Sequence, residues 1–141
     1  MKQALYDNLK EVENVHWWFR ARRVIVHSLI SRLVLPKDVS VLEVGCGTGG
    51  NLKLLSEFGK VKAFEIETSA MVNAAKLGFA DVRHGYLPGS NPFKEEKFAL
   101  IVAMDVLEHI EDDKASMRDI EKILKPGGYF VATVPALKSM W

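Results

Sequence analysis

The feature that most constrains this chain is an apolar segment, VSVLEV at 39–44, that runs directly into the glycine-rich sequence GCGTGG at 45–50. The apolar segment predicts a buried strand, and NLKLLSEFG after it predicts a helix. Gly45, Gly47 and Gly49 lack Cβ atoms at every second position, so the backbone can turn sharply and approach a ligand closely. The free N–H groups of the following helix favour a small polar ligand there, and a ligand-free turn is the alternative.

The alternation of strands and helices continues along the chain. Residues 98–104, FALIVAM, are apolar almost without interruption, which is typical of a buried central strand in a parallel sheet. The helix that begins near TSAM is expected to take Thr68 or Ser69 as its N-cap. A helix at 20–34 precedes the first strand and is expected to end at Pro36. The other predicted elements are a helix at 2–13, strands at 61–66, 80–85 and 129–135, a helix at KASMRDIEKIL and a turn at PGG.

Strands that alternate with short helices predict an α/β fold with an open parallel sheet and right-handed crossovers. A length of 141 residues suits one domain, so we predict a single domain over 1–141, with a helical cap at 1–36 and the α/β core at 37–141. The net charge of +1 favours neither nucleic acid nor an anionic membrane as a partner. Without a signal peptide or a long apolar run, the sequence predicts a cytoplasmic protein.

The spacing of the glycines is compatible with two kinds of cofactor. Gly45, Gly47 and Gly50 also satisfy the G-x-G-x-x-G pattern of dinucleotide-binding proteins, with Glu65 about twenty residues further on. An NAD(P)-binding oxidoreductase domain is therefore an alternative. Glu43 argues against it, because a carboxylate beside the turn repels a phosphate and suits a cationic amino group.

Several segments carry a resemblance to a known family. VLEVGCGTGGN resembles the first motif of the class I S-adenosylmethionine-dependent methyltransferases, and AFEIE, FALIVAMDVLEHI and LKPGGYFVATVP are similar to later motifs of that family in the same order. The match covers about residues 39–135, and HWWFRARR at 16–23 is similar to a segment that packs over the cofactor pocket in a subset of these enzymes. The resemblance implies a Rossmann-like, doubly wound sheet in the order 3-2-1-4-5 and S-adenosylmethionine as cofactor, with S-adenosylhomocysteine as product.

The resemblance also implies where that cofactor would lie. Its methionine end is expected near Glu43 and Gly45, its ribose at Glu65, and its adenine against Ile66 and the loop that follows the third strand. Tyr86 stands where the family usually has an aspartate, so its contact differs from the family pattern. The full set of predicted cofactor-binding residues is Glu43, Gly45, Cys46, Gly47, Thr48, Gly49, Glu65, Ile66, Tyr86, Leu87, Asp105, Val106, Trp17 and Arg20.

Methyl transfer from a sulfonium needs alignment of the nucleophile more than acid or base catalysis, so few catalytic side chains are expected. Asp105, Glu108 and His109 follow the fourth predicted strand at positions that would share one face of a helical turn. Asp105 and His109 are the catalytic candidates, His109 as a general base. A pocket wall with a helix cap is one alternative. Another is a divalent metal site, as in the quinone O-methyltransferases that D-x-x-E-H resembles, and we predict no metal.

Three further groups of residues in and before the fold have predicted roles. Cys46, the single cysteine, is expected to be a packing residue and no nucleophile. Trp17 and its aromatic neighbours suit either helix packing or a cation–π contact with a sulfonium. Among Arg20, Arg22 and Arg23, one side chain could pair with the cofactor's carboxylate, and a solvated basic face is the alternative.

The family normally continues beyond the fifth strand with a helix and two further strands, so we expect a truncated domain without those C-terminal antiparallel strands. The segment 129–135 would then be an exposed edge strand that can pair with another chain, which predicts a homodimer. We expect a methyltransferase that acts on a small molecule. The alternatives are a cofactor-binding fragment without turnover and a module used only for assembly.

Overall fold

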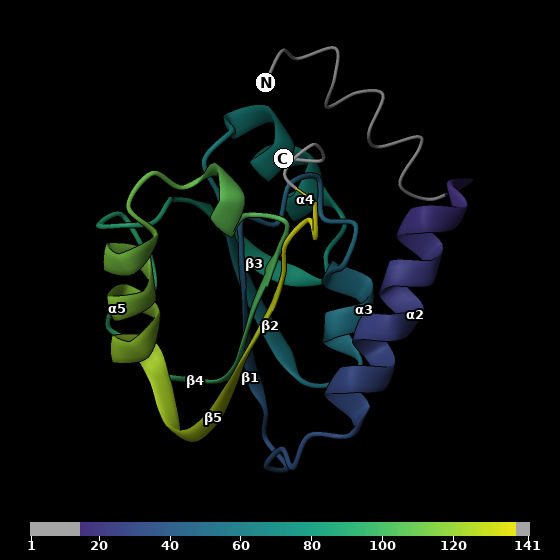
Figure 1. Ribbon diagram of the computed structural model, residues 1–141, viewed down its shortest axis with the longest axis horizontal. Coiled ribbons are helices and arrows are strands. Elements are labelled where there is room, and N and C mark those ends of the chain that lie inside the picture. The colour runs from purple at the N-terminus through teal and green to yellow at the C-terminus, as the bar shows by residue number, and fades with distance from the viewer. Residues whose placement is uncertain (1–14, 138–141) are drawn as a thin grey trace.

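The computed structural model describes residues 15–137, so the helix predicted at 2–13 lies outside the described residues. The strands form one five-stranded parallel sheet in the order β3-β2-β1-β4-β5. Helices α2 and α3 lie on one face of the sheet and α5 on the other (Figure 1). The elements are α2 (Trp17–Ser31), β1 (Ser40–Val44), α3 (Leu52–Ser56), β2 (Lys60–Glu65), α4 (Thr68–Lys76), β3 (Ala80–His84), β4 (Phe98–Met104), the 3-10 helix η1 (Leu107–His109), α5 (Asp113–Ile123) and β5 (Leu124–Thr133).

The sheet confirms the predicted Rossmann-like α/β fold and the strand order 3-2-1-4-5. Strand β4 lies between β1 and β5, and all seven of its residues are buried. Successive side chains of a strand point to opposite faces. Leu100 and Val102 therefore join the core cluster under α2 and α3, whereas Ile101 and Ala103 join the cluster on the α5 side. The continuous apolar run of β4 exists because both faces of the sheet are covered.

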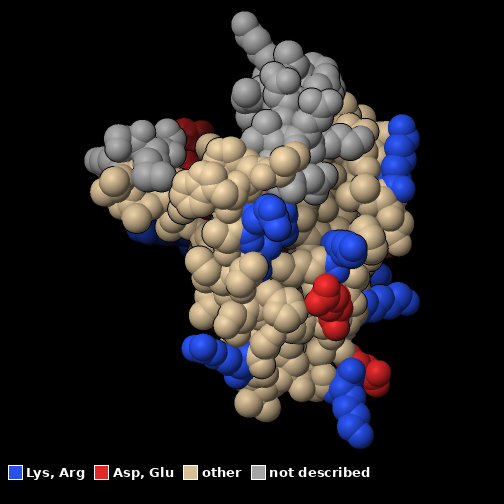
Figure 2. All heavy atoms as spheres, turned by 90° about the vertical axis from the view of Figure 1, so that its right-hand side faces the viewer, with Lys and Arg blue, Asp and Glu red and all other residues tan. Residues whose placement is uncertain are grey.

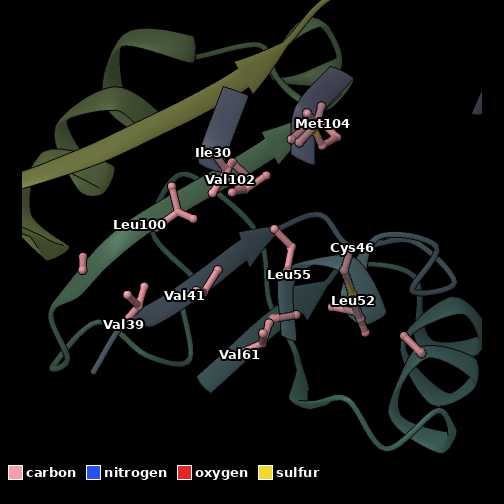
Figure 3. Close-up of a cluster of buried hydrophobic side chains, with 14 residues drawn as sticks. Ile30, Val39, Val41, Cys46, Leu52, Leu55, Val61, Leu100, Val102 and Met104 are labelled. Carbon is pink, nitrogen blue, oxygen red and sulfur yellow. The ribbon is translucent and has the colours of Figure 1, made fainter. Parts of the chain in front are cut away.

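Helix α2 is longer at its N-terminal end than the sequence predicts. It begins at Trp17, where the His16 side chain caps it by accepting a hydrogen bond from the Trp18 N–H at 3.3 Å. It ends at Ser31, before it reaches Pro36, so proline is not what stops it. Ile30 lies against the sheet near Val102 (Figure 3). Packing of its inner face thus holds α2 on the sheet.

Two other local predictions need correction. The N-cap of α4 is Glu67, neither Thr68 nor Ser69, because its carboxylate accepts hydrogen bonds from the Ser69 hydroxyl and, at 2.7 Å, from the Ala70 N–H. These two bonds hold the pKa of Glu67 below its ordinary value. The PGG segment, predicted as a turn, lies within β5 and coincides with a shift of register against β4.

Strand β5 forms one edge of the sheet and is paired with β4 alone within residues 15–137. The truncation and the homodimer stay predictions. The boundary at residue 36 between a helical cap and the α/β core also stays a prediction. No helix in the described part of the chain is long and apolar enough to cross a membrane. The location in the cytoplasm also stays a prediction.

The outward face of α2 is apolar as well, with Val24, Ile25 and Leu29 exposed. The side of the molecule that carries α2 and α3 is accordingly mostly uncharged, with scattered Lys and Arg side chains and fewer acidic ones (Figure 2). The two neighbours Leu29 and Ile30 thus share one helix and differ in burial.

We expect Ile30→Ala to lower the free energy of unfolding by about 2–4 kcal/mol, because Ile30 is fully buried and its loss leaves a cavity under α2. Leu29→Ala is the matched control: its side chain is 50% exposed, so a change within about 0.5–1 kcal/mol is expected. Urea denaturation followed by circular dichroism measures both values. Equal effects of the two substitutions would contradict the placement of α2.

Candidate functional site

A cavity of about 950 Å³ lies at the carboxyl ends of β1, β2 and β4, where ligands bind in parallel α/β sheets. Its volume is at the upper end of the range for small-molecule sites. The lining comes from the glycine-rich turn, the ends of the strands, the loop after β3, η1 and α2. The residues are Phe19, Arg22, Arg23, Val44, Gly45, Cys46, Gly47, Thr48, Gly50, Asn51, Phe64, Glu65, Ile66, Gly85, Tyr86, Leu87, Pro88, Met104, Asp105, Val106, His109, Ile110, Glu111 and Asp112.

The glycine-rich turn is bound to the end of β2. The N–H groups of Gly45 and Cys46 both donate to the carbonyl oxygen of Phe64, at 2.9 and 3.2 Å. Gly45 and Gly47 have φ angles of +66° and +55°, which side chains disfavour. A Cβ on Gly45 would meet Val106 at 2.7 Å, whereas a Cβ on Gly47 would meet nothing within 4 Å. Gly45 is therefore required by packing and conformation, and Gly47 leaves open space above the turn.

Gly49 has a different role from the one predicted. It lines a smaller hollow between α2, α3 and the α4 end instead of the main cavity. A Cβ on Gly49 would meet Leu77 at 2.8 Å and Leu52 at 3.1 Å. Gly49 thus serves helix packing behind the turn, which the regular glycine spacing alone does not distinguish from ligand contact.

Glu65, at the end of β2, binds the turn from the other side. Its Oε2 accepts a hydrogen bond from the Gly47 N–H at 2.8 Å, and its Oε1 accepts one from the Glu67 N–H at 3.0 Å. The side chain is buried yet contributes to the cavity lining. Each carboxylate oxygen has a second lone pair, so Glu65 can also accept hydrogen bonds from a ligand's hydroxyl groups.

Glu43 does not line the cavity, although the sequence predicts it beside the ligand. It is 1% exposed, and its Oε1 accepts a hydrogen bond from the Asn51 amide at 2.9 Å. Asn51 does line the cavity, and it makes no side-chain cap bond to α3 although it stands at the N-cap position. Glu43 therefore acts on the site through Asn51. The position of Asn51 directly after the glycines is the sequence feature that could have predicted its contact with Glu43.

Asp105 connects the ends of β4 and β5 with α2. Its N–H donates to the Thr133 carbonyl at 2.9 Å, and the Thr133 hydroxyl donates to Asp105 Oδ1 at 2.9 Å. Asp105 has a φ of +53°, the positive value that Asp and Asn adopt more readily than most residues. Its Oδ2 accepts a hydrogen bond from Arg22 Nη1 in an ion pair. A residue predicted as catalytic is thus already held by a cation.

His109 and Glu108 lie 4.0 Å apart, Nε2 to Oε1, and differ in burial. The His109 side chain is 71% exposed and contributes to the cavity rim. The Glu108 side chain is almost fully buried outside the cavity lining, and its Oε2 has no hydrogen-bond partner. Within residues 15–137, no group of three metal-binding side chains is close enough to hold an ion. The prediction that no metal binds at Asp105, Glu108 and His109 stays a prediction.

The loop after β3 provides an apolar wall. Tyr86 is partly exposed and Leu87 is buried, and both contribute to the lining together with Ile66, which follows β2; their contact with adenine stays a prediction. Tyr86 and Ser90 exchange backbone hydrogen bonds of 3.0 and 3.2 Å, which closes this loop. Val106 and Thr48 also line the cavity at their predicted positions.

The α2 residues at the cavity are not the predicted ones. Trp17, which is 70% exposed, and Arg20 do not contribute to the lining, whereas Phe19 and Arg22 do. The Arg22 guanidinium carbon lies 5.2 Å from the centre of the Phe19 ring. Phe19 and Arg22 share the helix face of the buried Val26, three to four residues apart. That spacing could have predicted which face of α2 points toward the cavity.

The comparisons with known proteins agree with this geometry. A family model described as a methyltransferase domain matches residues 17–140. A probable S-adenosylmethionine-dependent methyltransferase of Mycolicibacterium smegmatis is 28% identical over 122 residues, which are 85% of this chain and 46% of that protein. The ubiquinone biosynthesis O-methyltransferase of Parvibaculum lavamentivorans is 31% identical over 83% of this chain and 49% of its own length.

Solved structures show the same fold. DesVI of Streptomyces venezuelae superposes with a TM-score of 0.73 at 22% identity, over 100% of this chain and 61% of that chain. A glycopeptide N-methyltransferase complexed with S-adenosylmethionine superposes with a TM-score of 0.64 at 20% identity, over 77% of this chain and 53% of that chain.

Sheet order, glycine turn and cavity together define the class I methyltransferase fold. The chain belongs to the methyltransferase domain family, which confirms the family recognised from the motifs. It spans about half the length of the two curated relatives described above.

The local structure makes a prediction about Cys46. Burial, together with the nearby carboxylates Glu43 and Glu65, raises the pKa of its thiol, and the thiolate is the reactive form. We expect the native chain to react with a disulfide reagent at pH 8 far more slowly than the urea-unfolded chain. Because Cys46 is the single cysteine, the absorbance of the released thiol reports this site alone. Equal rates in the two states would contradict the placement of Cys46.

Proposed function

We propose that this chain is the cofactor-binding part of an S-adenosylmethionine-dependent methyltransferase that acts on a small molecule. The observation that carries the proposal is the buried Glu65 carboxylate, which binds the glycine turn and also faces a cavity large enough for the cofactor. A phosphate-binding turn would not place a second carboxylate, Glu43, beneath the same glycines.

The residues present fit the proposed cofactor. Glu65 would hold the ribose hydroxyls, and Ile66, Tyr86 and Leu87 would contact the adenine. The methionine end would lie over the open space at Gly47. This cofactor supplies a methyl group on a positively charged sulfur, which makes the methyl group reactive toward a nucleophile.

The chain's own residues would align the acceptor and remove its proton. Alignment of the acceptor with the reactive methyl group would supply a large part of the rate increase. His109 is exposed at the rim and has an imidazole that can take the proton lost by a hydroxyl or amine acceptor. Asp105, which is held by Thr133, would orient the acceptor.

The proposed acceptor is a small molecule. The near-neutral net charge gives no electrostatic footprint for nucleic acid. The relatives' names include ubiquinone biosynthesis and sterol methyltransferases, so related proteins use different small acceptors. Ile110, Glu111 and Asp112, which line the same cavity, would contact the acceptor.

To test the cofactor, we would titrate the chain with S-adenosylhomocysteine and, separately, with NADH in a calorimeter. We expect saturable binding of S-adenosylhomocysteine and none of NADH. Glu65→Gln should weaken that binding by about tenfold or more, because it removes charge-assisted hydrogen bonds to the ribose. Glu121→Gln, an exposed substitution on α5, is the matched control and should leave binding unchanged.

Either of two results would overturn the proposal. Binding of NADH without S-adenosylhomocysteine would favour the oxidoreductase alternative. Equal binding by the wild-type chain and Glu65→Gln would remove Glu65 from the site. Thermal melts of both variants, compared with the wild type, separate a lost contact from a lost fold.

We further propose that the free edge of β5 pairs with a second copy of the chain, because its N–H and C=O groups on that side have no strand partner within residues 15–137. Light scattering at high concentration is expected to give the mass of a dimer. Ala132→Pro should restore the monomer, because the Thr133 carbonyl accepts from β4 and the N–H of the preceding residue therefore points to the free edge. A wild-type monomer at the highest concentration would contradict the dimer.

A further inference from the structure

The Arg22–Asp105 ion pair stands inside the cavity that the proposed cofactor would occupy. Both residues contribute to the lining, and both side chains are partly accessible. The acidic residues Glu65, Glu111 and Asp112 share this lining, so a ligand that brings its own carboxylate needs an arginine to meet it. Arg22 is an arginine of the lining, and its described partner, Asp105, belongs to the same lining.

We propose that Arg22 exchanges partners: the cofactor's carboxylate takes the place of Asp105, and the released Asp105 then binds the methyl acceptor. This inference rests on the proposed function, because it requires a ligand with an α-carboxylate. It deepens that function by making Arg22 a switch between the two halves of the site, so that the acceptor binds after the cofactor.

The geometry of Arg22 favours exchange. The ion pair described joins Arg22 Nη1 to Asp105 Oδ2, and a guanidinium can bind a ligand's carboxylate through two parallel hydrogen bonds. The side chains of Arg22 and Asp105 are 17% and 36% exposed, so a carboxylate brought in by a bound ligand can reach the pair and compete with Asp105 for the guanidinium. The Phe19 ring stacked near the guanidinium keeps the Arg22 side chain at the cavity during the exchange.

Asp105 stays in place after release. Its Oδ1 accepts the Thr133 hydroxyl at 2.9 Å, and its N–H donates to the Thr133 carbonyl at 2.9 Å, so the carboxylate is fixed independently of Arg22. The oxygen that becomes available is Oδ2. A fixed carboxylate with one available oxygen binds a hydroxyl or an ammonium group, which identifies an acceptor that carries one of these.

The test compares two ligands on four chains. S-adenosylhomocysteine carries the carboxylate, and 5′-methylthioadenosine lacks the whole amino acid end. Their dissociation constants are measured by calorimetry for the wild type, Asp105→Asn, Arg22→Gln and the double variant. Asparagine suits the positive φ of residue 105 and can still accept from Thr133, so Asp105→Asn keeps the local fold.

We expect Asp105→Asn to tighten S-adenosylhomocysteine binding by about two- to tenfold, because Arg22 no longer has to leave an ion pair. Arg22→Gln should weaken it by about tenfold or more. In the Arg22→Gln background, Asp105→Asn should have no further effect. None of these changes should alter binding of 5′-methylthioadenosine. Arg20→Gln, on the same helix and outside the lining, is the matched control.

The exchange is overturned if Asp105→Asn weakens S-adenosylhomocysteine binding, since Asp105 would then only position Arg22. It is also overturned if the tightening persists in the Arg22→Gln background, because repulsion between the two carboxylates would explain it. If the wild type binds both ligands and Arg22→Gln has no effect, the exchange fails and the proposed function stands. If the wild type binds neither, the proposed function fails first.

Discussion

The closure of the glycine turn onto the end of β2 is the interaction on which the site depends. Two N–H groups of the turn share the Phe64 carbonyl, and the next residue along β2, Glu65, accepts the Gly47 N–H. The turn therefore has its direction fixed by the neighbouring strand as well as by its own glycines. A ligand that rests on the turn must meet Glu65, and the parallel pairing of β1 with β2 brings the two together. The pairing of β1 with β2 thus sets the sheet order and also places the Glu65 carboxylate beside the turn.

Much of this arrangement follows from sequence alone. The apolar run of β4 and the strand-turn-helix at Gly45 predict the sheet, and the resemblance to a known family supplies its order and the role of Glu65. Helix phase was harder to predict. The predicted start of α2 lies three residues late and leaves Phe19 outside the helix, so Trp17 and Arg20 were predicted where Phe19 and Arg22 line the cavity.

Pairings between distant residues were the other limit. Glu43 and Asn51 are separated by the turn, and Arg22 and Asp105 by most of the fold, so no local pattern joins them. Their partners depend on how α2 and α3 pack on the sheet. The sequence accordingly identified Asp105 as polar and close to the chemistry, without showing that a cation already holds it. The sequence likewise did not show that Glu43 is buried and contacts the cavity lining only by way of the Asn51 amide.

The uneven attachment of α2 has a mechanical consequence. Its fully packed residues, Val26 and Ile30, lie in the C-terminal half, whereas the N-terminal half reaches the ends of the strands through the Arg22–Asp105 charge pair. Helix α2 is therefore held by apolar packing in its C-terminal half and by one charge pair in its N-terminal half. Breaking the charge pair would leave the core contacts of Val26 and Ile30 in place, so the two ends of α2 are held by independent interactions.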